Sequence, residues 1–348
     1  MLIKRMCLLL LVTISIKTVC VKPKKQFLGI KVDTLLSEKI SIRALSVFKN
    51  TVYYAADKNR IGKIELTTGK NTQLKVERDS IIAEFRSCAK TKNYFFALSI
   101  ANPALLYRFS ADLKSKKLVY TEQNDTVFYD SMQFYDEQNG IAIGDPIHGR
   151  MSIILTRDGG ASWHKNTLKN APLMDDDEAF FAASNSTISI KNGKTWVFSG
   201  GKKARLFYSN DKGISWKTTE TPIIQGEKMT GIFTSDFYND KIGIVAGGNY
   251  EKPSQNYKNK AITFDGGLTW KLLPDENEVG YSSCIQFFPQ SKGRQIVSVG
   301  LMGIYLSNNY GTTWIKVSTE KSLNTIRFIT PTTAVAAGKN KIIKIKFY

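Results

Sequence analysis

The sequence has few residues of the kinds that form covalent cross-links. Only four of its 348 residues are cysteines, and two of these, Cys20 among them, lie near the N-terminus. The other two, Cys88 and Cys284, are too few for a disulfide framework in a domain of this size. We expect both to be buried and unbridged, on innermost strands of units that are not neighbours.

Motifs of common enzyme and cofactor sites are also missing. The sequence has no Gly-x-Gly-x-x-Gly between a strand and a helix for a dinucleotide, and no Gly-x-Ser-x-Gly nucleophile elbow. His148 and His164 are the only histidines, and no group of His and Cys has the spacing of a metal site. The sequence therefore predicts no metal and no cofactor.

Long hydrophobic runs are absent except at the start. Residues 6–16 form an apolar run after two basic residues, which is the pattern of a secretory signal peptide and too short for a membrane span. We predict that residues 1–20 are a signal peptide and that the mature chain is exported to the periplasm, the outer surface or the medium. Acylation of Cys20 is an alternative that Lys17 and Val19 disfavour.

Negative charge is scarce relative to positive charge. Lys and Arg number 49 against 30 Asp and Glu, which gives a net charge of +19. Apart from runs at residues 22–25 and 339–346 the basic residues are scattered, as is typical of a solvated surface. No nucleic-acid module is present, so we expect no nucleic-acid partner. An anionic polysaccharide or a lipid surface stays possible as a partner.

What the sequence does contain is one motif repeated four times. The template is Ser/Thr-x-Asp-x-Gly-x-Ser/Thr-Trp, and it recurs about every 45 to 55 residues, the length of a β-propeller blade. The acid can accept backbone N–H bonds within the turn, Gly allows positive φ, and Trp begins the next strand as an apolar anchor. The acid or amide and the Trp of the four copies are Asp158 and Trp163, Asp211 and Trp216, Asp265 and Trp270, and Asn309 and Trp314.

This motif resembles the Asp box of the bacterial neuraminidase repeat. The Asp box occurs in sialidase-like propellers and in propellers similar to photosystem II stability/assembly factors. The resemblance covers about residues 125–318, and it implies a β-propeller with structural Asp boxes on one rim and ligands on the opposite face. It does not transfer a chemistry, because propellers carry unrelated functions.

A second repeat indicates how many blades to expect. Seven short apolar segments end in Gly or a small residue and read as interior strands. They are residues 52–56, 94–98, 141–144, 196–200, 242–247, 296–300 and 334–338. We predict an all-β fold: one seven-bladed propeller of four-stranded antiparallel blades over residues 21–348, with the strand Phe27 to Leu36 closing the ring beside the C-terminal strands.

The candidate site residues are polar residues that, with this assignment of strands to blades, lie on the face opposite the Asp boxes. They come from innermost strands, from loops between second and third strands and, for Glu178, from the connection between two blades. The predicted ligand-binding set is Arg43, Arg86, Asp130, Asp145, His148, Arg150, Glu178 and Arg205.

Two interpretations of this set are open. The arginines can pair with acids such as Asp130 or Glu178 across a water-filled channel, or they can form a clamp for a carboxylate or sulfate. Asp145 and Glu178 are the candidates for a catalytic carboxylate pair.

We predict a monomeric binding or scaffold protein with a protein or glycan partner that carries negative charge. The alternative is a sialidase-like or other glycoside hydrolase acting on extracellular glycans. Sialidases use an arginine triad, for which Arg43, Arg86 and Arg205 are available here. However, the Arg-Ile/Leu-Pro motif that opens sialidase domains is absent.

Overall fold

The computed structural model describes residues 26–348 except residues 79, 167 and 276–278. The predicted signal peptide and Cys20 lie outside the described residues. Within these described residues, one short 3-10 helix, η1 (Leu168–Asn170), accompanies 28 antiparallel strands. Among the described residues, no helix has the length and apolar character needed to cross a membrane.

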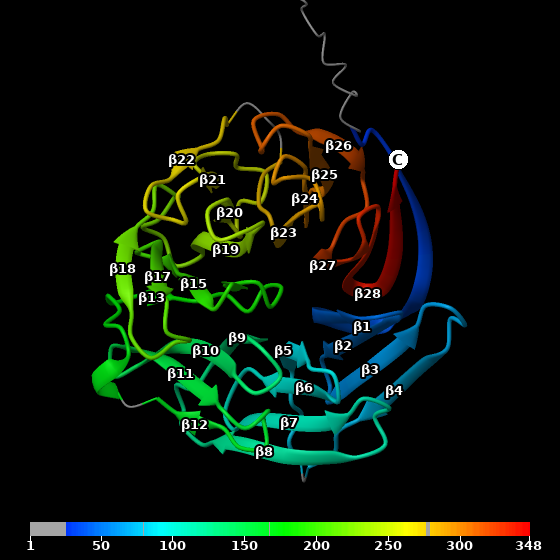
Figure 1. Cartoon of the computed structure of the whole chain (residues 1–348), viewed down its shortest axis with the longest axis vertical. Coiled ribbons are helices and arrows are strands. Elements are labelled where there is room, and N and C mark those ends of the chain that lie inside the picture. The colour runs from blue at the N-terminus through cyan, green and yellow to red at the C-terminus, as the bar shows by residue number, and fades with distance from the viewer. Residues whose placement is uncertain (1–25, 79, 167, 276–278) are drawn as a thin grey trace, which may run out of the picture.

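The strands form six hydrogen-bonded sheets around a central axis (Figure 1). The first contains, in spatial order, β27 (Leu323–Thr330), β28 (Thr333–Phe347), β1 (Ile30–Phe48), β2 (Thr51–Ala56), β3 (Arg60–Glu65) and β4 (Asn71–Lys75). The second contains β5 (Phe85–Lys90), β6 (Tyr94–Ser99), β7 (Ala104–Ser110) and β8 (Lys116–Glu122). The third contains β9 (Tyr129–Phe134), β10 (Gly140–Ile147), β11 (Arg150–Thr156) and β12 (His164–Lys165).

The other three sheets complete the arrangement. The fourth contains β14 (Ile188–Lys191), β15 (Lys194–Phe198), β17 (Arg205–Ser209) and β18 (Lys217–Glu220). The fifth contains β13 (Glu178–Ala179), β16 (Gly200–Gly201), β19 (Thr230–Phe237), β20 (Gly243–Asn249), β21 (Lys260–Thr263) and β22 (Lys271–Leu272). The sixth contains β23 (Cys284–Phe287), β24 (Ile296–Gly300), β25 (Gly303–Ser307) and β26 (Ile315–Ser318).

The prediction of seven four-stranded blades is wrong, because the strands form six sheets. The prediction of seven came from counting seven apolar segments in the sequence. In the structure, two of the units counted in this way are joined by hydrogen bonds into one sheet. β1 is one strand of 19 residues that pairs with β28 over its first part and with β2 over its second part. Two of the predicted units are therefore one continuous sheet.

The predicted ring-closing strand is wrong for the same reason. Residues from Ile30 onward belong to β1, which continues to Phe48 and lies in the interior of the six-stranded sheet. The N-terminal segment is thus not a separate strand that completes a seventh blade. Its pairing with β28 is internal to the first sheet.

Aromatic side chains fill the spaces between neighbouring sheets. Trp163 is only 4% exposed and lies edge-on to Phe134 of its own sheet, with ring centroids 5.6 Å apart. It also lies edge-on to Phe96 of the second sheet at 6.4 Å. Such contacts between large rings add to the free energy gained by burying their area. The repeat Trp anchors its sheet to the preceding one.

The four repeat turns, at residues 156–163, 209–216, 263–270 and 307–314, share one hydrogen-bond pattern. In the first, Gly160 N–H donates to Thr156 Oγ1 at 2.9 Å, and Thr156 Oγ1 donates to Asp158 Oδ1 at 2.8 Å. Ser162 donates its backbone N–H to Asp158 Oδ1 at 3.1 Å and its hydroxyl to Oδ2 at 2.6 Å. Gly160 has φ 77°, and a Cβ there would lie 2.3 Å from the Phe96 ring. Asp211, Asp265 and Asn309 accept corresponding bonds in the other three turns.

Cys88 and Cys284 are free and buried, as predicted. Burial raises the pKa of the Cys88 thiol to about 12, although the charge of Arg327 opposes this rise. A thiol that stays protonated is a poor nucleophile and a poor metal ligand. Cys88 therefore acts as a small apolar side chain of an inner strand, whereas Cys284 Sγ accepts a hydrogen bond from Arg327 Nη1 at 3.3 Å.

Candidate functional site

The strand directions define two faces of the ring. The inner strands β5, β9, β19 and β23 begin at one face, which we call the upper face, and end at the lower face. Arg86 and Asp130 are each the second residue of an inner strand, so they lie toward the upper face. The repeat turns follow the ends of strands that run parallel to the inner ones, so they lie at the lower face.

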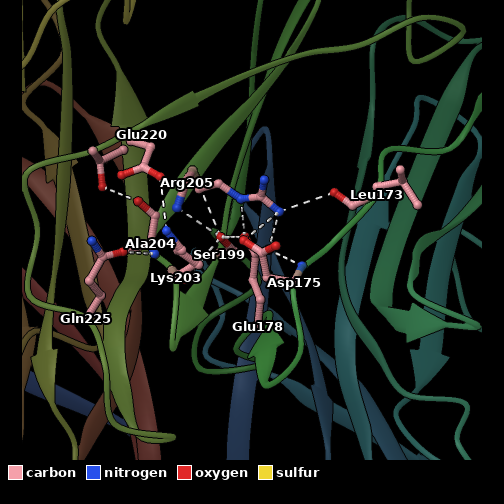
Figure 2. A network of polar contacts seen from close by, with 10 residues as sticks. Leu173, Asp175, Glu178, Ser199, Lys203, Ala204, Arg205, Glu220 and Gln225 are labelled. Atoms are coloured by element: carbon pink, nitrogen blue, oxygen red, sulfur yellow. Dashed lines mark hydrogen bonds and ion pairs between the residues drawn. The ribbon is translucent and has the colours of Figure 1, made fainter.

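Arg205 and Glu178 form the best-defined polar pair of the upper face (Figure 2). Arg205 is the first residue of β17, and its Nε donates to Glu178 Oε1 at 2.9 Å while Nη2 donates to Oε2. Glu178 is 1% exposed and also accepts the Ser199 hydroxyl at 2.5 Å and the Asp175 N–H at 2.9 Å. Both carboxylate oxygens are occupied, so this pair holds the loop to the sheet instead of facing an open cleft.

The other predicted arginines have separate partners. Arg86 forms a two-point ion pair with Glu84, at 2.9 and 3.0 Å. Arg150 Nη1 donates to Ala171 O at 2.8 Å, and Arg43 Nη1 donates to Ala183 O at 3.4 Å. His148 is exposed in the turn between β10 and β11, with φ 53°. The structure therefore does not bring the four arginines to one point as a clamp.

Two buried carboxyl groups lie close to each other near Arg86. Asp130 is fully buried, and neither carboxyl oxygen makes a hydrogen bond of normal geometry with the described residues, although the backbone N–H groups of Ala182 and Asp145 lower its pKa. Burial and the charge of Asp145 raise its pKa well above the usual range, against the effect of Arg86. Burial also raises the pKa of Asp145 to about 6, although Phe180 N–H donates to its Oδ1 at 2.8 Å. Two nearby buried acids resist ionising together.

Sequence reasoning missed a segment that enters the central channel. The chain between β13 and β14, green in Figure 1, extends to the middle of the ring. We call residues 182–187 the plug. Asn185 is 3% exposed and has φ 56°, a left-handed conformation that Asn tolerates well. Its amide donates to Cys88 O at 2.7 Å and accepts Met132 N–H at 2.8 Å.

The plug also contacts sheets on the other side of the channel. Arg327 Nη2 donates to the carbonyls of Ser184 and Asn185 at 3.0 and 3.1 Å. Ser186 O accepts Ser235 N–H from β19 at 2.9 Å. The plug thus joins inner strands of the first, second, third and fifth sheets. Its sequence signal was a run of small residues, Ala182 to Thr187, of which the last four are polar.

A cavity of about 560 Å³ lies at the lower-face end of the inner strands. Its volume falls within the roughly 300–1,000 Å³ that is common for ligand pockets. Its lining includes the ends of β1, β14, β19, β23 and β27, from which come Val47, Lys191, Asp236, Gln286 and Arg327. We call it the lower cavity. Sequence analysis named none of these five as a site residue.

The charged side chains of the lower cavity differ in how many hydrogen bonds and ion pairs they form with the protein. The side chain of Lys191, the last residue of β14, forms no hydrogen bond or ion pair with the described residues. Arg327 donates through both Nη atoms to neutral oxygen and sulfur atoms. Asp236 Oδ2 accepts Phe287 N–H at 2.8 Å, and burial raises the pKa of Asp236 although Lys191 opposes this rise. The positive charge of the cavity exceeds its negative charge.

Comparison with solved structures identifies the fold. The structure of "YCF48 bound to D1 peptide" matches with a TM-score of 0.68 at 11% identity, over 94% of this chain and 97% of that one. "YCF48 from Cyanidioschyzon merolae" has a TM-score of 0.65 at 12% identity, over 92% and 99%. "Structure of U3-55K" has a TM-score of 0.63 at 12% identity, over 90% and 98%. The chain is a β-propeller.

No protein-family model matches the sequence, and no curated protein matches it either. Sequence identities of 11 and 12% show similarity of fold alone. The function therefore has to be argued from this chain's own residues.

Proposed function

We propose that this protein is a binding scaffold that holds a segment of a partner protein at its lower cavity. The observation that carries the proposal is the cavity itself, where Lys191 has no ion-pair partner among the described residues and stands beside half-buried apolar side chains. Small pockets that combine apolar lining with a few fixed charges are typical of binding sites.

One comparison supports a polypeptide as the partner. The propeller with a TM-score of 0.68 to this chain is described as bound to a D1 peptide. Propellers also present short loops and strand ends on a rigid ring, which suits recognition of extended chains. The partner of this chain need not be related to that peptide.

We further propose that the four repeat turns are Asp boxes and that the predicted leader exports the chain. The hydrogen bonds of Asp158 and its three counterparts support a structural role for the boxes. An exported scaffold would meet its partner outside the cytoplasm. A glycan partner is the second candidate, because the excess of lysine and arginine would attract anionic sugars.

The glycoside hydrolase alternative has less support. A glycosidase needs two carboxyl groups beside a sugar-sized pocket. Glu178 is occupied by Arg205 and Ser199, and Asp130, which lies near Asp145, is fully buried. These acids are therefore better explained as parts of the fold.

Site-specific crosslinking in the native host tests the proposal. A photo-crosslinking amino acid at Gln290, an exposed residue of the lower cavity, should attach to one polypeptide. The same amino acid at His148, which is exposed in an upper-face loop, is the matched control. Equal crosslinking to the same protein from both positions, or crosslinks at Gln290 only to glycan, would contradict the proposal.

A further inference from the structure

We infer that the lower cavity binds the C-terminal end of a polypeptide, with the terminal carboxylate at Lys191 and Arg327 and an apolar last side chain against the cavity wall. This inference rests on the proposed function and specifies the part of the partner that the cavity recognises. It is carried by the shape of the channel, the charges of the cavity and its apolar lining.

The channel is closed behind the cavity. Arg327 reaches from the cavity to the plug, where its Nη2 holds the carbonyls of Ser184 and Asn185. Asn185 in turn is bonded to Cys88 O and Met132 N–H on the far side. A chain cannot pass through a channel that is filled in this way. A closed pocket of this kind is suited to a chain end.

The charges select which chain end enters. Lys191 and Arg327 are the two cations of the cavity, and Asp236 is its one acid among the described lining residues. Burial raises the pKa of Asp236, which favours its uncharged form more than usual. Lys191 has all three ammonium N–H groups available, since its side chain bonds to none of the described residues. A carboxylate would be attracted here, and a protonated N-terminus would be repelled.

Arg327 contributes a fixed charge instead of a mobile one. Its Nη1 donates to Thr325 Oγ1 at 3.1 Å and to Ile326 O at 2.7 Å, and its Nη2 is held by the plug. Because the guanidinium is already oriented, no side-chain entropy is lost when an anion approaches. Both Nη groups are occupied by protein acceptors, so Arg327 attracts a carboxylate through its charge, and Lys191 supplies the charge-assisted hydrogen bonds.

The apolar part of the lining indicates that the ligand carries an apolar group next to its carboxylate. Val47, Tyr238, Pro289 and Phe328 line the cavity and are each partly exposed. They form the surface on which an apolar side chain next to the carboxylate gains free energy by leaving water. A sulfated or carboxylated sugar would place hydroxyl groups against the same surface.

The experiment uses an array of random decapeptides attached by their N-termini. Each peptide is printed twice, with a free C-terminal carboxylate and with a C-terminal carboxamide, and probed with the purified chain. We expect binding of peptides that end in an apolar residue, and about tenfold weaker binding of their carboxamide forms. Lys191→Glu should reduce binding of the carboxylate forms by at least that factor.

Lys217→Glu is the matched control, because Lys217 is exposed on the outermost strand β18 and carries the same change of charge. It should leave binding nearly unchanged. Equal binding of carboxylate and carboxamide forms, or equal losses in both variants, would overturn the inference while leaving the binding proposal intact. Binding of no peptide, together with retention on an anionic polysaccharide resin that Lys191→Glu abolishes, would overturn both.

Discussion

At the scale of the residue, the buried acids Asp130 and Asp145 are the least expected feature of the chain. A buried carboxyl group without a hydrogen-bond partner is costly when charged, so it tends to stay protonated. Asp130 comes close to this description, because it is fully buried, neither oxygen makes a hydrogen bond of normal geometry with the described residues, and burial outweighs the effect of the nearby N–H groups of Ala182 and Asp145 on its pKa. Asp145 accepts one backbone hydrogen bond, from Phe180 N–H, and burial raises its pKa to about 6.

Replacing Asp145 by Asn should change how stability depends on pH. Burial raises the pKa of Asp145 from 3.8 to about 6 in the folded chain. The protonated group therefore stabilises the fold fully below about pH 4, and this contribution is lost as the pH rises through about 6. The shift corresponds to at most about 3 kcal/mol. Asn keeps an oxygen for Phe180 N–H but never ionises.

Urea unfolding of both proteins between pH 4 and pH 7 measures this effect. The free energy of unfolding of Asp145→Asn should rise relative to that of the natural chain as the pH increases. Parallel pH profiles would show that Asp145 has an ordinary pKa in the folded chain.

At the scale of the element, the repeat turns show how a short motif determines local structure. The acid satisfies backbone N–H groups that the turn leaves without partners, and the Gly adopts a left-handed φ. The turn from Ser110 to Lys114 contains only the first part of the motif. Asp112 accepts the Ser110 hydroxyl at 2.6 Å and Lys114 N–H at 3.1 Å, but no Trp follows it.

Asp211→Ala should lower the free energy of unfolding by about 1 to 3 kcal/mol, because several hydrogen bonds within the turn are lost. Asp211 accepts backbone N–H groups of Ile214 and Ser215 at 3.1 and 2.9 Å, and the Ser215 hydroxyl at 2.5 Å. Asp112→Ala is the control, and should have a smaller effect. Chemical denaturation of both variants measures the difference, and equal effects would contradict a special role for the complete motif.

At the scale of the whole molecule, the plug connects sheets that are distant along the chain. Asn185 contacts the second and third sheets, and its carbonyl accepts a bond from Arg327 of the first sheet. Such cross-links make the centre of the ring a polar network and not an open channel. Buried networks of this kind are stabilising only when nearly all members are satisfied.

Asn185→Ala should therefore destabilise the whole ring, by about 3 kcal/mol or more, since it leaves Cys88 O and Met132 N–H without partners in a buried site. Asn185→Ala also introduces backbone strain, because Ala disfavours φ 56°. Asn185→Gly removes the same amide without this strain, so comparing the two variants separates the loss of hydrogen bonds from the strain. Thermal unfolding should show both variants below the natural chain and Gly slightly above Ala. A normal melting temperature for Asn185→Gly would show that the amide bonds contribute little.

Some features were predictable because they depend on local chemistry. The antiparallel β fold, the turn motifs and the two free cysteines follow from spacing and from residue type. The number of sheets was not predictable, since a strand of 19 residues looks like two strands when it is bent and paired on both sides. The choice between an arginine clamp and pairing with acids could not be made from the sequence. Arg86 pairs with Glu84, two residues away, and Arg205 with Glu178 from another sheet.

By itself the sequence determined the propeller architecture and the conformation of its repeat turns. The turn residues of each repeat act within about eight residues, so the conformation of the turn does not depend on the rest of the chain. The regular recurrence of the turns then indicates repeated units of blade length. Only the tertiary structure decided that two predicted units merge into one sheet, that residues 182–187 fill the channel, and that Lys191, Asp236 and Arg327 meet around one cavity. Those outcomes depend on which strands and side chains become neighbours when the ring forms, and that information is spread over the whole chain.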